Sequence, residues 1–190
     1  MLSGRAGAPL TSKAIARMHT IRSTGLSLEP QVAAHADEMF AVLSDPAIYE
    51  YERAPPASVE QLRERFTRLE SRRSPDGEEL WLNWVIRLST SPLIGYVQAT
   101  LRPNGRAAIA YELSSAYWGR GLAHEAVQAM ISELVQYYEV RHLFAVLKRK
   151  NLRSSRLLGR LGFLLSPLEE HVRRNIDADE QLMHCDVQLA

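Results

Sequence analysis

The sequence predicts a mixed α/β (α+β) fold in which helices flank a mixed, mostly antiparallel sheet. Three strand-like segments follow one another over 81–114, two helix-like segments precede them, and two strand-to-helix units complete the pattern. The expected element order is therefore β-α-α-β-β-β-α-β-α-β-β. Because 190 residues suit one domain, we expect a single domain over 19–190 and a flexible or loosely packed N-terminal extension over 1–18.

The N-terminal elements are assigned from capping signals and periodicity. A strand is expected at 19–28, followed by a helix that begins at the Glu-Pro pair at 29–30 and ends at the Asp-Pro pair at 45–46. A second helix is expected over 58–72, since Ser58 opens a capping-box pattern and apolar residues follow it at helical spacing.

The central segments are predicted to form an antiparallel meander of strands at 81–88, 93–102 and 106–114. The Asn-Gly pair at 104–105 between the last two is a strong signal for a tight hairpin. Beyond the meander we expect a helix, a strand, a short helix and two final strands, at 122–137, 142–148, 151–161, 163–168 and 180–189.

Composition excludes several classes of protein. A net charge of +1 argues against attraction of the whole molecule to nucleic acid, so no nucleic-acid partner is expected. No apolar run is long enough for a membrane span, so no membrane partner is expected. The single cysteine, Cys185, excludes an internal disulfide and fits a reducing, cytoplasmic location. The six histidines show no ligand spacing, so no metal is expected.

An acid-free basic segment at 141–168 has two interpretations. It is either a solvated helix face or a surface that attracts a polyphosphate ligand. A third function, nucleic-acid binding through the same segment, has no recognition motif to support it.

Gly119 and Gly121 lie where a strand passes into a helix. A helix N-terminus presents unpaired N–H groups and a partial positive charge, and glycine lets the backbone approach an anion closely. Arg120 adds a cation. A second strand-to-helix unit begins at Asn151, with Ser154 in its first turn. Successive units of this kind point their helix N-termini to the same sheet edge, so the two are expected to flank one cleft.

The segment YWGRGLAHEA at 117–126 resembles the pyrophosphate-binding motif of the GNAT superfamily of acyl-CoA N-acyltransferases, written Q/R-x-x-G-x-G/A. Trp118 stands at the polar first position. This tryptophan and the later N-x-x-S…LGF pattern are similar to the RimJ/RimL-like branch. The likeness covers roughly 19–189 by element order.

The resemblance implies a V-shaped sheet and acetyl-CoA as co-substrate, entering between the strands at 106–114 and 142–148. Pantetheine is expected at the backbone of Leu113, Ser114 and Ser115. The pyrophosphate is expected on Gly119, Arg120, Gly121, Leu122 and Ala123. Trp118 is expected to contact the coenzyme beside them, with Asn151 and Ser154 on the far side of the cleft.

The implied reaction is N-acetyl transfer to a primary amine by direct attack in a ternary complex. Ser154 is the candidate hydrogen-bond donor to the leaving sulfur, since Leu158 stands where many relatives carry a tyrosine acid. Glu112 is the candidate base for the amine proton. Each has a structural alternative: Ser154 as a first-turn residue of its helix and Glu112 as a paired surface carboxylate.

The acceptor is expected to be a small-molecule amine or a peptide N-terminal α-amine, bound near Tyr49, Glu50 and Tyr51. The alternative for these three residues is a solvated loop. The alternative function, kept open by Leu158, is a non-catalytic acyl-CoA-binding or sensing module on the same fold. The oligomeric state is expected to be a monomer or a homodimer.

Overall fold

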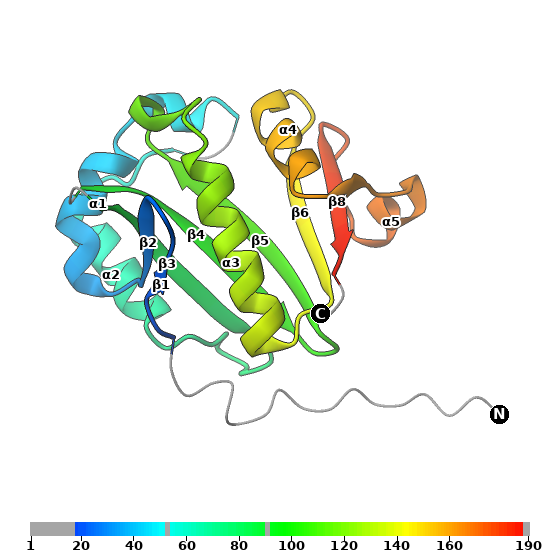
Figure 1. Ribbon diagram of the computed structural model, residues 1–190, viewed down its shortest axis with the longest axis horizontal. Coiled ribbons are helices and arrows are strands. Elements are labelled where there is room, and N and C mark those ends of the chain that lie inside the picture. Colours follow the sequence, from blue (N-terminus) through cyan, green and yellow to red (C-terminus); the bar gives the residue numbers. More distant parts are fainter. Residues whose placement is uncertain (1–17, 52–53, 90–91, 188–190) are drawn as a thin grey trace.

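A computed structural model describes residues 18–51, 54–89 and 92–187 (Figure 1). All but the last residue of the predicted 1–18 extension lies outside the described residues. The strands are β1 (Ile21–Arg22), β2 (Leu26–Pro30), β3 (Leu80–Leu88), β4 (Leu93–Arg102), β5 (Arg106–Leu113), β6 (His142–Lys148), β7 (Leu164–Leu165) and β8 (Glu180–Asp186). The α-helices are α1 (Ala36–Leu43), α2 (Val59–Leu69), α3 (Leu122–Tyr138), α4 (Leu152–Arg160) and α5 (Leu168–Arg173), and short 3-10 helices are η1 (Ala33–His35), η2 (Pro46–Tyr49) and η3 (Ser115–Tyr117).

The described strands form one sheet in the order β1-β2-β3-β4-β5-β6-β8-β7. Every neighbouring pair is antiparallel except β5 and β6, which are parallel. The predicted mixed, mostly antiparallel sheet is therefore confirmed. The meander is confirmed as well, with the strands β3, β4 and β5 within one residue of their predicted bounds.

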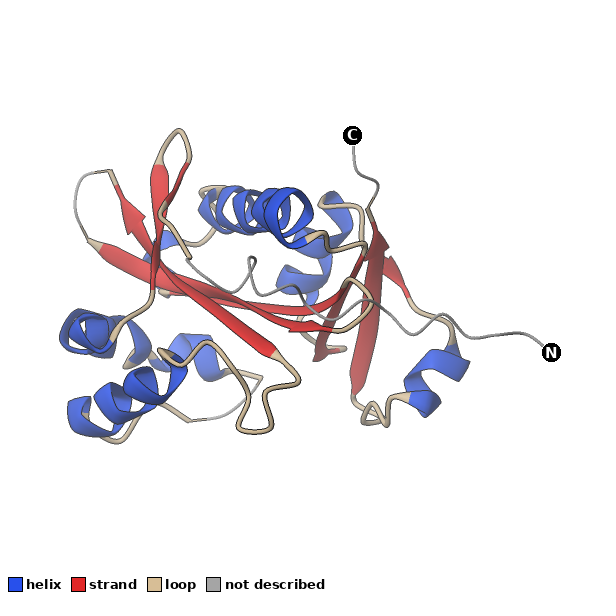
Figure 2. Cartoon of the chain, turned by 90° about the horizontal axis from the view of Figure 1, so that it is seen from below, coloured by secondary structure: helices blue, strands red, loops and turns tan. Residues whose placement is uncertain are grey.

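The sheet opens between β5 and β6. These two strands pair only at their N-terminal ends, where 106–108 lie beside 142–144. Beyond that point the strands diverge, and 109–113 face 145–147 across a cavity. The divergence divides the sheet into the two arms of the predicted V, seen edge-on in Figure 2.

Helices cover both faces of the larger arm. α3 packs on one face, over a core that includes Trp84 of β3, which is fully buried. α1 and α2 pack on the other face, where Val85 of the same strand joins their apolar residues. The alternation of neighbouring β3 side chains between two separate cores explains why this strand is almost continuously apolar.

The first predicted helix begins later than expected. The sequence prediction put its start at 29–30, whereas β2 continues through Pro30, opposite Trp84 of β3. The residue before a proline favours extended backbone, and Gln31 continues the pairing by donating its N–H to the carbonyl of Asn83. Helical structure starts only at η1. The predicted single strand at 19–28 is likewise a hairpin of β1 and β2.

The C-terminal region holds a helix that the sequence prediction missed. The predicted strand at 163–168 is only the two-residue β7, and α5 follows it. His171 fastens α5 to the sheet: its Nδ1 lies 3.0 Å from the carbonyl oxygen of Pro167, and its Nε2 accepts the N–H of Leu182 at 2.9 Å. A helix of only six residues is too short to give a periodic signal in the sequence, so α5 was not predicted.

Candidate functional site

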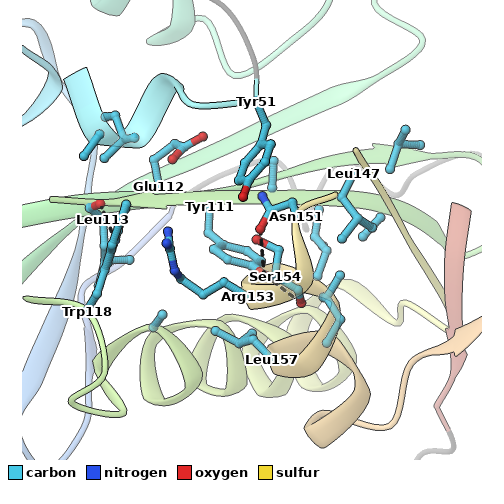
Figure 3. A pocket seen from close by; sticks show the side chains of 18 residues that line it. Tyr51, Tyr111, Glu112, Leu113, Trp118, Leu147, Asn151, Arg153, Ser154 and Leu157 are labelled. Carbon is cyan, nitrogen blue, oxygen red and sulfur yellow. Dashed lines mark hydrogen bonds between the residues drawn. The ribbon is translucent and has the colours of Figure 1, made fainter. Parts of the chain in front are cut away.

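The opening between β5 and β6 contains a cavity of about 140 Å³, which we call the gap cavity. Its walls come from the diverging strands, from η2 and from the start of α4 (Figure 3). Of the predicted site residues, it is lined by Tyr51, Glu112, Leu113, Trp118, Ala123, Asn151 and Ser154. The fold therefore brings residues from four separate parts of the chain to one place.

Leu113 presents its backbone to the gap cavity. Ser114 donates its N–H to the carbonyl of Ile94 at 2.9 Å, so these two residues form a hydrogen-bonded pair across β4 and β5. In an antiparallel ladder the next residue turns its polar groups the other way, and those of Leu113 point toward the opening. Trp118 Nε1 donates to the Leu113 carbonyl at 3.0 Å, which places the indole on the cavity wall.

The glycine turn before α3 forms an open cradle. Gly119 and Gly121 have φ angles of 73° and 79°, a left-handed conformation that side chains disfavour, and a Cβ at either position would meet nothing within 4 Å. The first i→i−4 bond of α3 runs from Glu125 N–H to the Gly121 carbonyl. The N–H groups of 122–124 therefore precede any helical acceptor and face outward from the helix N-terminus. A cavity of about 400 Å³, which we call the cradle cavity, lies over this turn.

The start of α4 forms the opposite wall. The Asn151 side chain caps this helix by accepting the Ser154 N–H at 3.0 Å. Tyr111 of β5 reaches across the cavity and donates to the Ser154 carbonyl oxygen at 3.5 Å. Figure 3 shows Tyr111 and Glu112 on opposite sides of β5, as strand alternation requires.

Capping by Asn151 predicts a measurable loss of stability. Asn151→Ala is expected to cost about 1 kcal/mol, or a melting temperature lower by about 2–4 °C, because the N–H of Ser154 loses its acceptor. Asn151→Ser, which keeps a capping oxygen, should stay close to the unmodified protein in the same thermal melt. Equal melting of Asn151→Ala and Asn151→Ser would contradict the capping role.

Glu112 lies at the junction of two cavities. Its side chain lines the gap cavity and also a cleft of about 290 Å³ between α2, η2 and β4, which we call the α2 cleft. Tyr49 lines the α2 cleft and donates its hydroxyl to the Leu43 carbonyl at 2.8 Å. Tyr51 instead lines the gap cavity, where its side chain points toward Asn151 (Figure 3).

Comparison with known proteins agrees with this geometry. The family model described as Acetyltransferase (GNAT) domain matches residues 26–164. The chain belongs to the GNAT acetyltransferase family. A curated relative, the uncharacterized N-acetyltransferase p20 of Bacillus licheniformis, is 29% identical over 167 residues, which cover 84% of this chain and 93% of the relative.

Solved GNAT structures share the fold of this chain. RimL, a ribosomal L7/L12 α-N-protein acetyltransferase in complex with coenzyme A, has a TM-score of 0.73 at 16% identity and covers 89% of this chain and 98% of its own. The ribosomal-protein-S5-alanine acetyltransferase from Vibrio fischeri has a TM-score of 0.72 at 16% identity, with 89% and 97% coverage. The predicted resemblance to this superfamily is confirmed.

Several predicted residues of this GNAT acetyltransferase lie away from the cavities. Ser114 and Ser115 have their N–H groups engaged within the protein, by the Ile94 carbonyl and by Asp45 Oδ2 at 2.7 Å. Glu50 and Arg120 are exposed, and Arg120 lies over the ring of Tyr117. These four residues line none of the three cavities, and their roles in binding stay predictions.

Asp45 links η2 to the segment that follows β5, a contact that sequence reasoning missed. Its Oδ1 accepts the Ala47 N–H within η2, while its Oδ2 accepts the Ser115 N–H beyond β5. Hydrogen bonds from Ser115 hold the pKa of Asp45 below its usual range. The local signal, an Asp-Pro pair, indicates only the turn and not its partner 70 residues away.

The sequence indicates Arg153 only as part of the basic segment at 141–168, but the structure places it against Trp118. Its guanidinium carbon lies 3.5 Å from the centre of the Trp118 ring, and it lines both the gap cavity and the cradle cavity. The basic segment divides in the structure. Lys148 pairs with Asp179 and Glu180, whereas Lys150, Arg153, Arg156 and Arg160 line one surface hollow beside the cleft.

Tyr111 and Leu158 both line the gap cavity. Leu158 is buried and lines the cavity, so its position supplies an apolar wall. Burial raises the pKa of Tyr111 to about 12, which keeps its hydroxyl protonated at neutral pH. Cys185 lies on β8 beside Gly162, outside the residues that line the gap cavity, and burial raises the pKa of its thiol.

Within 18–51, 54–89 and 92–187, no group of three or more His, Cys, Asp or Glu side chains is arranged to hold a metal ion. In the same part of the chain, no helix combines the length and apolar character of a membrane span.

Proposed function

We propose that this protein transfers an acetyl group from acetyl-CoA to a primary amine by direct attack in a ternary complex. The observation that carries the proposal is the continuity of the three cavities. Leu113, Trp118 and Arg153 line both the cradle cavity and the gap cavity, and Glu112 lines both the gap cavity and the α2 cleft. The cradle cavity, the gap cavity and the α2 cleft therefore adjoin in that order, and we assign them to the anion, the thioester and the acceptor.

The residues present fit the parts of acetyl-CoA. The N–H groups at the start of α3 suit the pyrophosphate, because a helix N-terminus attracts anions. The hollow lined by Lys150, Arg156 and Arg160 suits the remaining phosphate. The Leu113 backbone, facing the opening, suits the amide groups of the pantetheine arm. This order would bring the thioester to the level of Glu112 and Ser154.

Acetyl-CoA supplies the activated acetyl group as a thioester. The amine nitrogen bonds to the acetyl carbon, the carbon–sulfur bond breaks, and the nitrogen loses a proton. We assign acceptance of that proton to Glu112, directly or through water. A lysine ε-amine with a pKa of ~10.4 costs roughly 4 kcal/mol to deprotonate near pH ~7.4, while an α-amine near ~7.8 costs about 0.5 kcal/mol. A carboxylate, being a weak base, therefore favours an N-terminal α-amine.

Ser154 is assigned to the sulfur as a hydrogen-bond donor, while Tyr111 donates its single hydroxyl proton to the Ser154 carbonyl oxygen and positions the start of α4. A phenol with a pKa of about 12 lies about 3.5 units above an ordinary thiol near ~8.5, so full proton transfer to the thiolate costs about 5 kcal/mol. Donating a hydrogen bond requires no such transfer. In this mechanism neither residue is a general acid. The mechanism therefore does not require a tyrosine at position 158, where this chain has a leucine.

The first test is a thermal shift with acetyl-CoA, followed by turnover on a panel of amines. At about 100 times the dissociation constant, binding adds roughly 2.7 kcal/mol of stability, which raises the melting temperature by about 5–10 °C. Release of free thiol that depends on an added amine would support the transferase. A thermal shift without turnover on any amine would favour the non-catalytic binding module, and the absence of a shift would contradict both.

The cytoplasmic location and the oligomeric state, a monomer or a homodimer, stay predictions.

A further inference from the structure

The α2 cleft combines an acidic end with a basic end. Glu112 lies where the cleft meets the gap cavity. On α2, Arg65 and Arg68 line the cleft three residues apart, so they lie on the same face of the helix. The rest of the cleft wall includes apolar residues, namely Leu43, Leu62 and the prolines 55–56.

Two nearby arginines, unlike Arg65 and Arg68, form ion pairs with carboxylates of the described residues. Arg63, on the same helix, pairs with Asp37 at 2.8 Å, and Arg87 pairs with Glu29 at 2.8 Å. Within the described parts of the chain, no carboxylate forms an ion pair with Arg65 or Arg68. Both side chains are exposed at the cleft, where a ligand can reach them.

We propose that the acceptor is an amine that also carries a carboxylate, which Arg65 and Arg68 bind while the amine lies at Glu112. The inference rests on the proposed acetyl transfer and names its substrate class. A guanidinium presents paired N–H donors that match the two oxygens of a carboxylate, and such charge-assisted bonds are stronger than neutral ones. The carboxylate would orient the acceptor, and the opposite charges at the two ends would set its direction.

The test compares acceptors that differ only in that charge. One arm uses the tripeptide amides Ala-Glu-Ala and Ala-Gln-Ala and, with the charge moved by one position, Ala-Ala-Glu and Ala-Ala-Gln. The other arm uses 5-aminopentanoate and its amide, so the two arms distinguish a peptide side chain from a small amino acid. We expect kcat/KM for the acidic member to exceed that of its neutral partner roughly 10- to 100-fold in one of the arms.

Substitutions assign the preference to the two arginines. Arg65→Gln and Arg68→Gln should each lower the acid-over-amide ratio roughly tenfold, and Arg65→Lys, which keeps the charge, should retain part of it. Arg63→Gln is the matched control, because it removes the same charge from the same helix at a residue that already pairs with Asp37. Its ratio should stay at the unmodified value.

The possible outcomes distinguish a failure of the carboxylate inference from a failure of the proposed acetyl transfer. Equal kcat/KM within each acid and amide pair would overturn the carboxylate inference and leave the acetyltransferase standing. An equal loss of preference in Arg63→Gln would also overturn it, since the effect would then come from general charge. Absence of turnover with every acceptor would overturn the proposed function, and this inference would fail with it.

Discussion

Gly121→Glu is expected to remove acetyl-CoA binding. Position 121 has a φ of 79° and open space above it, within the turn that we assign to the pyrophosphate. A glutamate there fills that space and puts a negative charge beside the anion. Two like charges about 4 Å apart at an effective dielectric of about 20 repel by roughly 4 kcal/mol. Allowing for screening, we expect at least a roughly 100-fold loss of affinity, measured by calorimetry or by loss of the thermal shift.

Gly77→Glu is the matched control for this substitution. Gly77 has a φ of 76° and, like Gly121, nothing within 4 Å of an added Cβ, but it lies in the turn before β3. Both variants therefore carry the same backbone strain, about 1–2 kcal/mol of lost stability. Only Gly121→Glu should lose coenzyme binding. Retention of full affinity in Gly121→Glu, or equal loss in both variants, would contradict the assignment of the turn.

Local signals account for the parts of the fold that were predicted well. The Asn-Gly pair at 104–105 and the alternating apolar residues around it lie within a few residues of the structure they determine, so β4 and β5 could be placed closely. The cradle was predictable for the same reason, because a left-handed glycine and a helix start occupy one short segment. The α5 helix was not, since a helix of only six residues is too short to give a periodic signal in the sequence.

The acceptor side depended on contacts that sequence spacing does not reveal. Tyr49 and Tyr51 are two residues apart, yet η2 directs them into different cavities. Asp45 stabilises this arrangement through a hydrogen bond from Ser115, in η3 after β5. In the sequence, Arg65 and Arg68 look like ordinary residues on the solvated face of a helix. Only the packing of α2 brings them into one cleft with Glu112. Side-chain direction at such sites follows from tertiary packing, which periodicity does not contain.

Glu112→Gln is expected to lower kcat at least roughly 100-fold while leaving the KM for acetyl-CoA within about threefold. The amide keeps the size of the side chain and its place at the junction of the two cavities, but it cannot accept the amine proton. Without the carboxylate, the variant loses the group assigned to accept the amine proton, so its pH–rate profile should differ from that of the unmodified enzyme.

Glu78→Gln is the control for the change in net charge, because Glu78 is exposed in the turn before β3 and lines none of the three cavities. Its kcat and pH–rate profile should match those of the unmodified enzyme. The acceptor provides a second check, since a base matters more when the amine must be deprotonated against a larger cost. The loss in Glu112→Gln should therefore be greater for a lysine ε-amine than for an α-amine. An unchanged pH–rate profile in Glu112→Gln would contradict the base role and leave Glu112 as a residue that positions the acceptor.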